Sequence, residues 1–410
     1  MKRSRQGWVG AFYLCSALFV SAQQAPPPTS QPDQSPLPAA GSSPTLTPRS
    51  HEERERNYES AHRIILNVEV TDASGKEVNG LKGEDFTLLD NQLPRKLLSF
   101  HEKNGIEPGA RAHAFLVLDA LNNNVRTMGF ERKGIENFLG RNQGHLVYPI
   151  TVGVLSHAGI SVSQPSQNGN ALIAELERMS SGLRPSSCAE EAGDGGLGKP
   201  LVGGAMVGLK GQVEEQSESG FSKMANCENA RFKLSISELD RLARNEVENP
   251  GRAILIWIGP GWPQLTGSQY IPDTPATRRG RFDYRVSLST ALREAQITLD
   301  AVSFPDRLRD AEPHGDADKA LISGVATEEQ ATVGSMALPV LVHETGGKSL
   351  EDSKDIAASI ATCLADAASY YVLSFNSSEA SKVGEYHALE LRVNRPVLTA
   401  RTNRAYYTQP

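Results

Sequence analysis

The chain has 410 residues, of which 39% are hydrophobic and 22% are charged, and its formal net charge is -6 at pH 7. This length and composition supply a sizeable core and exceed what one ordinary domain needs. The acidic balance, without a basic stripe, excludes nucleic acid as a partner, because nucleic-acid binding requires a basic face.

The chain begins with the features of an export signal. A positive start at residues 2–5 precedes an apolar run over residues 8–20 that is too short to span a bilayer. We therefore predict a signal peptide over residues 1–22 and a disordered linker rich in Pro, Gln and Ser over residues 23–58. We expect an extracytoplasmic protein, periplasmic or secreted, with no stable membrane insertion after signal cleavage.

The cysteines fit an oxidising compartment. Cys188 and Cys227 flank one glycine-rich segment and form the candidate disulfide. Cys363 lies on an apolar helical face, which indicates a buried free thiol. Cys15 lacks the small preceding residue of a lipoprotein cysteine, so a lipid anchor is the alternative that the sequence supports less.

Strand patterns dominate residues 59–106. Apolar residues alternate from Ile64 to Val70, and further extended segments follow at residues 86–89 and 96–100. This is an N-terminal β unit, too short to form a complete sandwich alone.

Helices and buried strands alternate over residues 110–375. The predicted strands cover residues 114–118, 148–155, 253–258, 297–304 and 370–375. The predicted helices cover residues 130–139, 170–179, 221–248, 287–295, 336–344 and 355–368. Short, mostly apolar strands separated by helices predict an α/β fold, with a doubly wound, mostly parallel sheet covered on both faces.

Two segments depart from this alternation. Residues 180–220 are rich in Gly, Ser and Glu and are predicted to form a flexible insertion. Residues 380–410 return to strand patterning. We expect these C-terminal strands to pack with the N-terminal β unit as a small accessory β unit.

Several segments, taken in order, resemble one family. They are Val68–Asp72 with Leu81, Glu84–Phe86 and Asp90, then Phe115–Asn122, the turn Glu344–Gly347, the strand Tyr371–Phe375, and the tail Tyr386–Tyr407. Over nearly the whole mature chain, this series is similar to the von Willebrand factor A (VWFA)-related proteins of acidobacteria. The resemblance implies a vWA domain, a Rossmann-like fold of the metal-dependent-adhesion type, with no assigned biological function.

The resemblance also implies where a metal would bind. Domains of this type that bind Mg²⁺ carry Asp-x-Ser-x-Ser after the first strand and a second aspartate after the fourth. Here Asp119 occupies the first aspartate position, Leu121 and Asn123 replace the serines, and Gly259 replaces the second aspartate. The amide oxygen of Asn122 adds no charge to offset dehydration of a cation. We therefore predict no cofactor, with Asp119 as the one weak candidate ligand should Mg²⁺ bind, and otherwise as a loop or helix cap.

The predicted binding residues are Asp119, Asn122, Asn123 and Trp262. Ligands of doubly wound sheets bind at the carboxyl ends of the strands, where the first three residues follow one strand. Trp262 lies in the Gly-Pro-Gly-Trp-Pro turn after another strand and is a candidate exposed contact residue.

Catalytic motifs are absent from the sequence. The glycine-rich residues 193–200 mimic a phosphate-binding loop but end in Pro200, which lacks the hydroxyl that such a loop needs. There is no Gly-x-Ser-x-Gly elbow, no zinc-peptidase helix and no recognisable catalytic triad. We name no catalytic residue.

These observations favour a non-enzymatic exported protein that mediates protein–protein interaction or adhesion in the cell envelope. Its partner would be an unidentified protein or other envelope component, and its metal-ion-dependent adhesion site is degenerate. The alternative is an unusual extracytoplasmic hydrolase that uses the cleft at the strand carboxyl ends, which would require convergent titratable groups. A purely structural envelope role is a third reading that the sequence does not separate from the first.

Overall fold

The structure is a computed structural model that describes residues 62–104, 113–185, 188, 210–249, 251–262, 274–304, 324–351, 353–378 and 382–408. The predicted signal peptide (1–22), the predicted linker (23–58) and the glycine-rich residues 193–200 lie outside the described residues. No helix in the described part of the chain is both long enough and apolar enough to cross a membrane.

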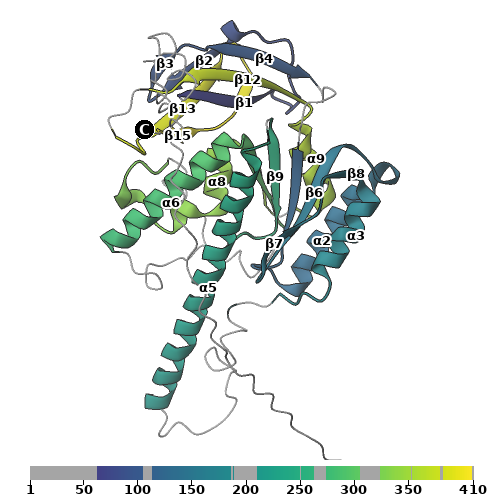
Figure 1. The fold of residues 1–410 in the computed structure, drawn as a ribbon, viewed down its shortest axis with the longest axis vertical. Coiled ribbons are helices and arrows are strands. Elements are labelled where there is room, and N and C mark those ends of the chain that lie inside the picture. The colour runs from purple at the N-terminus through teal and green to yellow at the C-terminus, as the bar shows by residue number, and fades with distance from the viewer. Residues whose placement is uncertain are drawn as a thin grey trace, which may run out of the picture. The chain divides into compact units, whose positions relative to one another are not determined.

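A mixed, mostly parallel sheet forms the centre of the α/β part (Figure 1). Within the described residues its order is β11 (Ser349–Leu350), β10 (Ile297–Val302), β9 (Ala253–Ile258), β5 (His113–Asp119), β6 (His145–Ser156) and β7 (Gly159–Val162), with β8 (Ser166–Asn168) also paired to β6. β7 and β8 run antiparallel to β6, and the other pairs are parallel. The predicted fold class is confirmed, and the sheet is consistent with a vWA-like fold.

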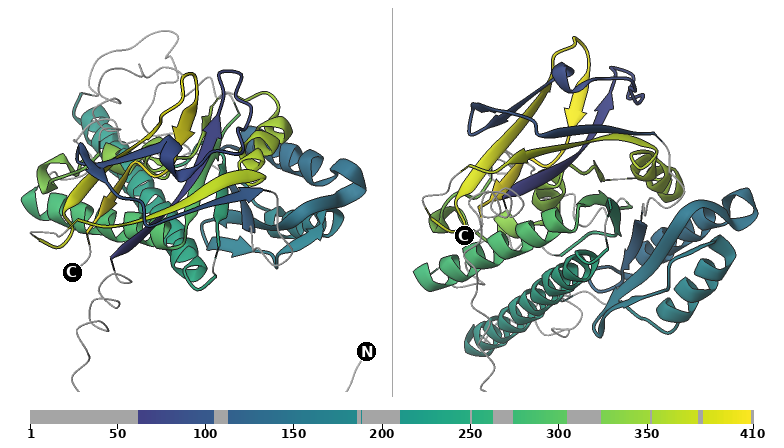
Figure 2. Two further views of the ribbon diagram at one scale, coloured as in Figure 1. Left: turned by 90° about the horizontal axis from the view of Figure 1, so that it is seen from above. Right: turned by 45° about the horizontal axis from the view of Figure 1, so that its top comes forward.

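Helices cover both faces of this sheet, and Figure 2 shows the two sets on opposite sides. α2 (Val125–Leu139), α3 (Gly169–Ser180) and α9 (Ile356–Ala365) share one apolar core with the sheet. α5 (Lys210–Glu246), α6 (Pro275–Glu294) and α8 (Leu338–Glu344) share the other. All six residues of β9 and of β10 are buried because both faces of the sheet are covered, and this explains the continuous apolar run of β9.

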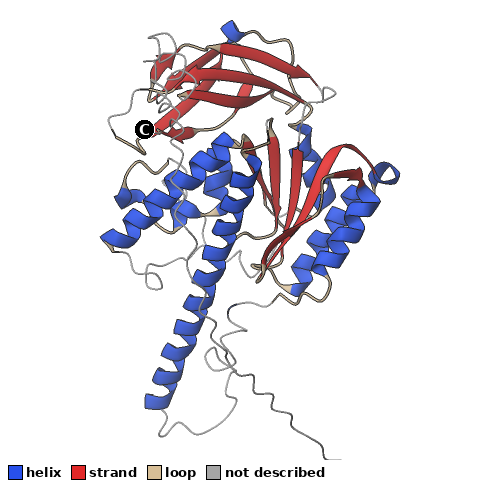
Figure 3. Cartoon of the chain, viewed as in Figure 1, coloured by secondary structure: helices blue, strands red, loops and turns tan. Residues whose placement is uncertain are grey.

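The accessory β unit is built from two antiparallel sheets (Figure 3). One has the order β14 (Thr399–Arg401), β1 (Arg63–Thr71), β12 (Ser369–Asn376) and β4 (Ser99–Asn104). The other has the order β15 (Ala405–Tyr407), β13 (Tyr386–Val393), β2 (Phe86–Asp90) and β3 (Leu93–Arg95). N-terminal and C-terminal strands therefore pair as the sequence predicts.

One strand belongs to a different sheet from the one predicted. The segment 370–375 was expected to end the parallel sheet, but it forms β12, which pairs antiparallel with β1 and β4. Its alternate side chains Tyr371, Leu373 and Phe375 lie in the core of the β unit. The strand follows a helix, as a parallel strand would, so local pattern alone did not distinguish the two cases.

Three helices begin well before their predicted starts, and for two of them a capping residue explains the start. α2 begins at Val125 because the side chain of Asn124 accepts a hydrogen bond from the Thr127 amide at 2.9 Å. α6 begins at Pro275, since Thr274 caps its first turn. α5 already begins at Lys210, so the end of the predicted flexible insertion is helical. Short 3₁₀ turns occupy Gly83–Asp85, Arg141–Gly144, Glu328–Gln330 and Gly334–Met336.

A disulfide joins Cys188 and Cys227, the pair that the sequence predicts. It ties the start of the insertion to α5. Cys363, on α9, is a buried free thiol as expected.

Charged side chains link the β unit to the amino ends of the parallel strands. Arg252, at the start of β9, forms an ion pair with Glu69 of β1 and donates to the backbone oxygen of Asp366 at 2.7 Å. The Asp366 carboxylate also pairs with Arg401 of β14 and, at 2.6 Å, with Lys348. Because this network occupies the amino ends of the strands, the β unit leaves their carboxyl ends clear.

Candidate functional site

Residues 119–124, 259–262 and 303–304 lie at the carboxyl ends of β5, β9 and β10, and we call these described residues the rim. β5 and β9 are neighbours, with Leu118 opposite Ile258, although the chain leaves β5 toward one side of the sheet and β9 toward the other. This is the topological switch point of a doubly wound sheet, the place where such sheets bind ligands. Three of the predicted residues, Asp119, Asn122 and Asn123, come together here.

Asp119 is fully buried, and neutral N–H groups hold both of its carboxylate oxygens. Oδ1 accepts from the backbone N–H of Asn122 at 3.0 Å, and Oδ2 accepts from the Trp257 indole at 3.0 Å. The side-chain amide of Asn122 donates to both oxygens, at 3.1 and 2.9 Å, and also to the Ser235 hydroxyl at 2.9 Å. The carboxylate is thus stabilised by donors from β9 and from its own loop.

These surroundings do not fit Mg²⁺. A magnesium ion needs oxygen ligands in near-octahedral geometry, whereas N–H donors already occupy the oxygens of Asp119. Gly259 has φ +137°, and a Cβ at that position would lie 2.7 Å from the Cβ of Asp119, so the β9 loop closes directly over the aspartate. No group of three or more metal-ligating side chains occurs in the described part of the chain.

Asn123 lies in the interior and connects two segments through a side-chain hydrogen bond. It is buried, and its side-chain amide donates to Glu131 at 2.5 Å. Glu131 is fully buried in α2, and its other oxygen accepts from the Phe304 amide at 3.0 Å. The pair therefore connects the β5 loop, α2 and the segment after β10.

Trp262 is not exposed, so its prediction as a contact residue is wrong. Its exposed fraction is 2%, its indole donates to the Met336 oxygen at 2.7 Å, and its ring meets that of Trp257 edge-on at 5.4 Å. Gly261, with φ +69°, turns the chain so that the indole enters the core beside Leu338. Burial of a large aromatic surface, with its N–H satisfied, outweighs exposure at the turn.

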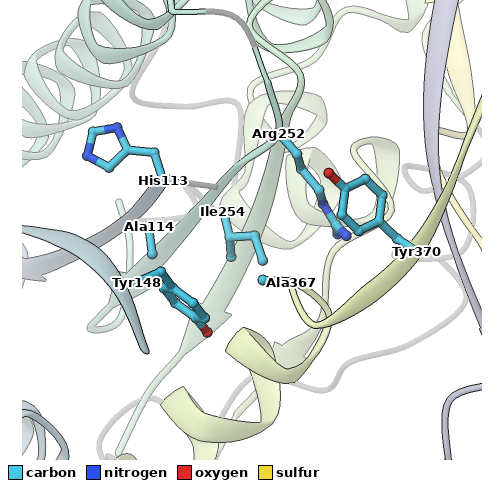
Figure 4. A pocket seen from close by; sticks show the side chains of 7 residues that line it. All are labelled: His113, Ala114, Tyr148, Arg252, Ile254, Ala367 and Tyr370. Carbon is cyan, nitrogen blue, oxygen red and sulfur yellow. The ribbon is translucent and has the colours of Figure 1, made fainter. Parts of the chain in front are cut away.

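Two hollows lie away from the rim. A cavity of about 10 Å³, with room for about one water molecule, lies at the amino ends of β5 and β9 (Figure 4). Its lining residues are His113, Ala114, Tyr148, Arg252, Ile254, Ala367 and Tyr370. An open hollow of about 450 Å³ is lined by Gln143, Gly144, His145, Gln167, Asn168 and Asn170. Neither hollow is lined by a carboxylate or by a nucleophilic Ser or Cys.

The polar groups of the small cavity bond to neighbours outside it. The His113 ring lies between Thr151, at 2.8 Å, and Glu246, at 3.1 Å. The Tyr148 hydroxyl donates to a backbone oxygen at 2.9 Å, and burial raises its pKa above the usual range. These hydrogen bonds hold the side chains in the packing at the amino ends of the strands.

Sequence reasoning missed a buried acid in β10. Asp300 is fully buried, and its Oδ1 accepts a hydrogen bond from the Lys348 backbone amide at 2.6 Å. Burial raises the pKa of Asp300 from 3.8 to about 6. The signal in the sequence is a single acidic residue, Asp300, within the predicted buried strand.

No protein-family profile and no curated protein matches the sequence. Solved structures with a distant likeness include the human COPII-coat protein Sec24c, with a TM-score of 0.29 and 9% identity over 75% of this chain and 46% of that chain. They also include the pilus adhesin SpaC from Lactobacillus rhamnosus GG, with a TM-score of 0.32 and 8% identity over 82% of this chain and 50% of that chain. The chain thus spans about half the length of each.

Proposed function

We propose that this chain is a non-enzymatic, vWA-like protein-interaction module that acts outside the cytoplasm, in adhesion or another contact within the cell envelope. The observation that carries the proposal is the state of the rim. Its polar side chains bond inward to one another, with Asp119 held by Asn122 and Trp257. A surface of this kind offers shape and side-chain contacts to a partner.

Two features support the proposed location outside the cytoplasm. The Cys188–Cys227 disulfide is of a kind that persists in oxidising compartments. The expected export signal over residues 1–22 agrees with it. Contact through the rim needs no metal in this proposal, since the Asp119 oxygens are already engaged.

Photo-crosslinking tests the proposal. A photoreactive residue is placed at Val125, 56% exposed beside the rim, or as a control at Val397, 76% exposed in the accessory β unit. In envelope fractions of the source organism we expect a discrete adduct from position 125 alone, and the purified partner must then bind the purified chain. Absence of an adduct at 125, or equal adducts from both positions, would refute a rim-directed interaction.

Enzymatic activity is tested separately. The mature chain is incubated with panels of ester, peptide, phosphate and glycoside substrates. We expect no turnover above that of a heat-denatured sample. Turnover that follows the protein through purification and is lost in Asp119→Asn would refute the non-enzymatic part of the proposal.

A further inference from the structure

The first turns of α2 expose apolar and cationic side chains next to the rim. Val125 is 56% exposed and Phe130 is 47% exposed, and Arg126 and Lys133 are exposed as well. Arg126, Phe130 and Lys133 recur at the spacing that places residues on one helical face. We call Val125, Arg126, Phe130 and Lys133, together with Phe304, the α2 strip.

The aromatic part of the α2 strip is held in place before any partner arrives. The rings of Phe130 and Phe304 stack with centroids 4.9 Å apart and an interplanar angle of 11°. The amide of Phe304 donates to the buried Glu131, which Asn123 also binds, so the segment after β10 is anchored to α2. A preorganised aromatic pair loses little conformational entropy on binding.

Cationic side chains lie beside Phe130 and farther along α2. The Arg126 guanidinium lies 5.9 Å from the centroid of the Phe130 ring and forms no ion pair with a described residue. Farther along α2, Arg132 and Lys133 share one carboxylate, that of Glu136, at 3.4 and 3.1 Å. The exposed face of α2 is therefore cationic on a chain whose formal net charge is -6.

Two carboxylates that precede the adjoining helix α9 form hydrogen bonds of their own. α9 packs on α2, where a Cβ at Gly134 would lie 2.4 Å from the Cβ of Ile356. Asp355, which precedes α9, uses its side chain to cap the Ala358 amide at 2.9 Å. Glu351 accepts from the Ser349 hydroxyl at 3.1 Å.

We propose that the α2 strip is the docking surface for an acidic, amphipathic segment of a partner protein. The segment's apolar side chains cover Phe130 and Phe304, and its carboxylates pair with Arg126 and Lys133. Exposed aromatic residues and arginine are the residue types that dominate binding energy at interfaces. An amphipathic helix seated on such a strip is a common recognition mode. This inference rests on the proposed function and names the chemistry of its partner.

Fluorescence anisotropy with defined peptides tests it on the full mature chain. The probe is a labelled synthetic amphipathic helix with leucines on one face and glutamates flanking them. The comparison peptides carry Lys in place of Glu, or Ser in place of Leu. We expect saturable binding of the acidic probe but not of the two comparison peptides, and added salt should weaken this binding. A Kd above about 1 mM for the probe, or equal binding of the Lys peptide, would overturn the proposal.

Matched variants locate the contact. Phe130→Ser should weaken binding about thirtyfold, as expected for a central aromatic anchor. Leu98→Ser is the control, because Leu98 is 45% exposed in the β unit, close to the 47% of Phe130. Equal binding by both variants would overturn the assignment to the α2 strip. Unchanged thermal midpoints verify that each variant is folded.

A second pair of variants changes only charge. Gly129 is exposed in α2, and a Cβ there meets nothing within 4 Å, so Gly129→Glu and Gly129→Lys both fit the fold. We expect Gly129→Glu to weaken binding of the acidic peptide about tenfold relative to Gly129→Lys. The same affinity in both would remove the argument from charge.

Two further outcomes separate the alternatives. Sedimentation that shows a concentration-dependent dimer lost in Phe130→Ser would make a second copy the occupant and overturn the acidic-segment proposal. If crosslinking from Val125 yields a confirmed partner while the peptide experiments fail, the proposed function stands and this inference does not.

Discussion

Asp300→Asn is the substitution whose effect the structure predicts most sharply. The aspartate is fully buried, and burial raises its folded pKa from 3.8 to about 6. An acid whose pKa is higher in the folded state favours folding while it is protonated, and that advantage disappears as pH rises through about 6. At neutral pH the pKa difference corresponds to about 3 kcal/mol of destabilisation from burying the charge. Asparagine keeps the acceptor for the Lys348 amide.

We therefore expect Asp300→Asn to gain up to about 3 kcal/mol of unfolding free energy relative to the wild type between pH 4 and pH 8. Urea unfolding at a series of pH values, followed by the fluorescence of the buried Trp257 and Trp262, measures this difference. Asp283→Asn, on an exposed position of α6, controls for removal of a surface carboxylate. If the wild-type and Asp300→Asn stabilities ran parallel across the whole pH range, the reasoning about this buried acid would be wrong.

Three further predictions follow from the packing of α2 and from the rim. Gly134→Ala should lower stability by about 1–3 kcal/mol in chemical denaturation, because the added Cβ would lie 2.4 Å from the Cβ of Ile356. Gly129→Ala, with open space around its Cβ, should instead raise stability by up to about 1 kcal/mol. Lower stability in both variants would contradict the expected difference between the two positions. Trp257→Phe removes an N–H donor from the buried Asp119 carboxylate and should cost about 2–3 kcal/mol, measured in the same assay; no change would mean that the bond is dispensable. Millimolar Mg²⁺ should leave the thermal midpoint unchanged in calorimetry, whereas a rise with metal concentration would show a cation site.

Residue types alone predict part of the chemistry of the candidate site. Replacement of the expected serines by Leu121 and Asn123, and of the second aspartate by Gly259, predicts a poor metal site from ligand chemistry. The structure adds that the aspartate accepts hydrogen bonds from Asn122 and Trp257. Trp257 lies 138 residues away from Asp119 in the chain, so no local pattern indicates that contact.

The sequence by itself determined the class of the fold and indicated the candidate disulfide pair, whose formation only the structure shows. Apolar runs in short strands, separated by amphipathic helices, are compatible with only a few layered arrangements, because each apolar face must be buried. Only the tertiary structure decided which sheet β12 joins, that Trp262 turns inward, and that Phe130 stacks on Phe304. Periodicity records which side of an element is buried, whereas the identity of the neighbour depends on contacts between residues that are distant in sequence, such as Arg63 and Asn376.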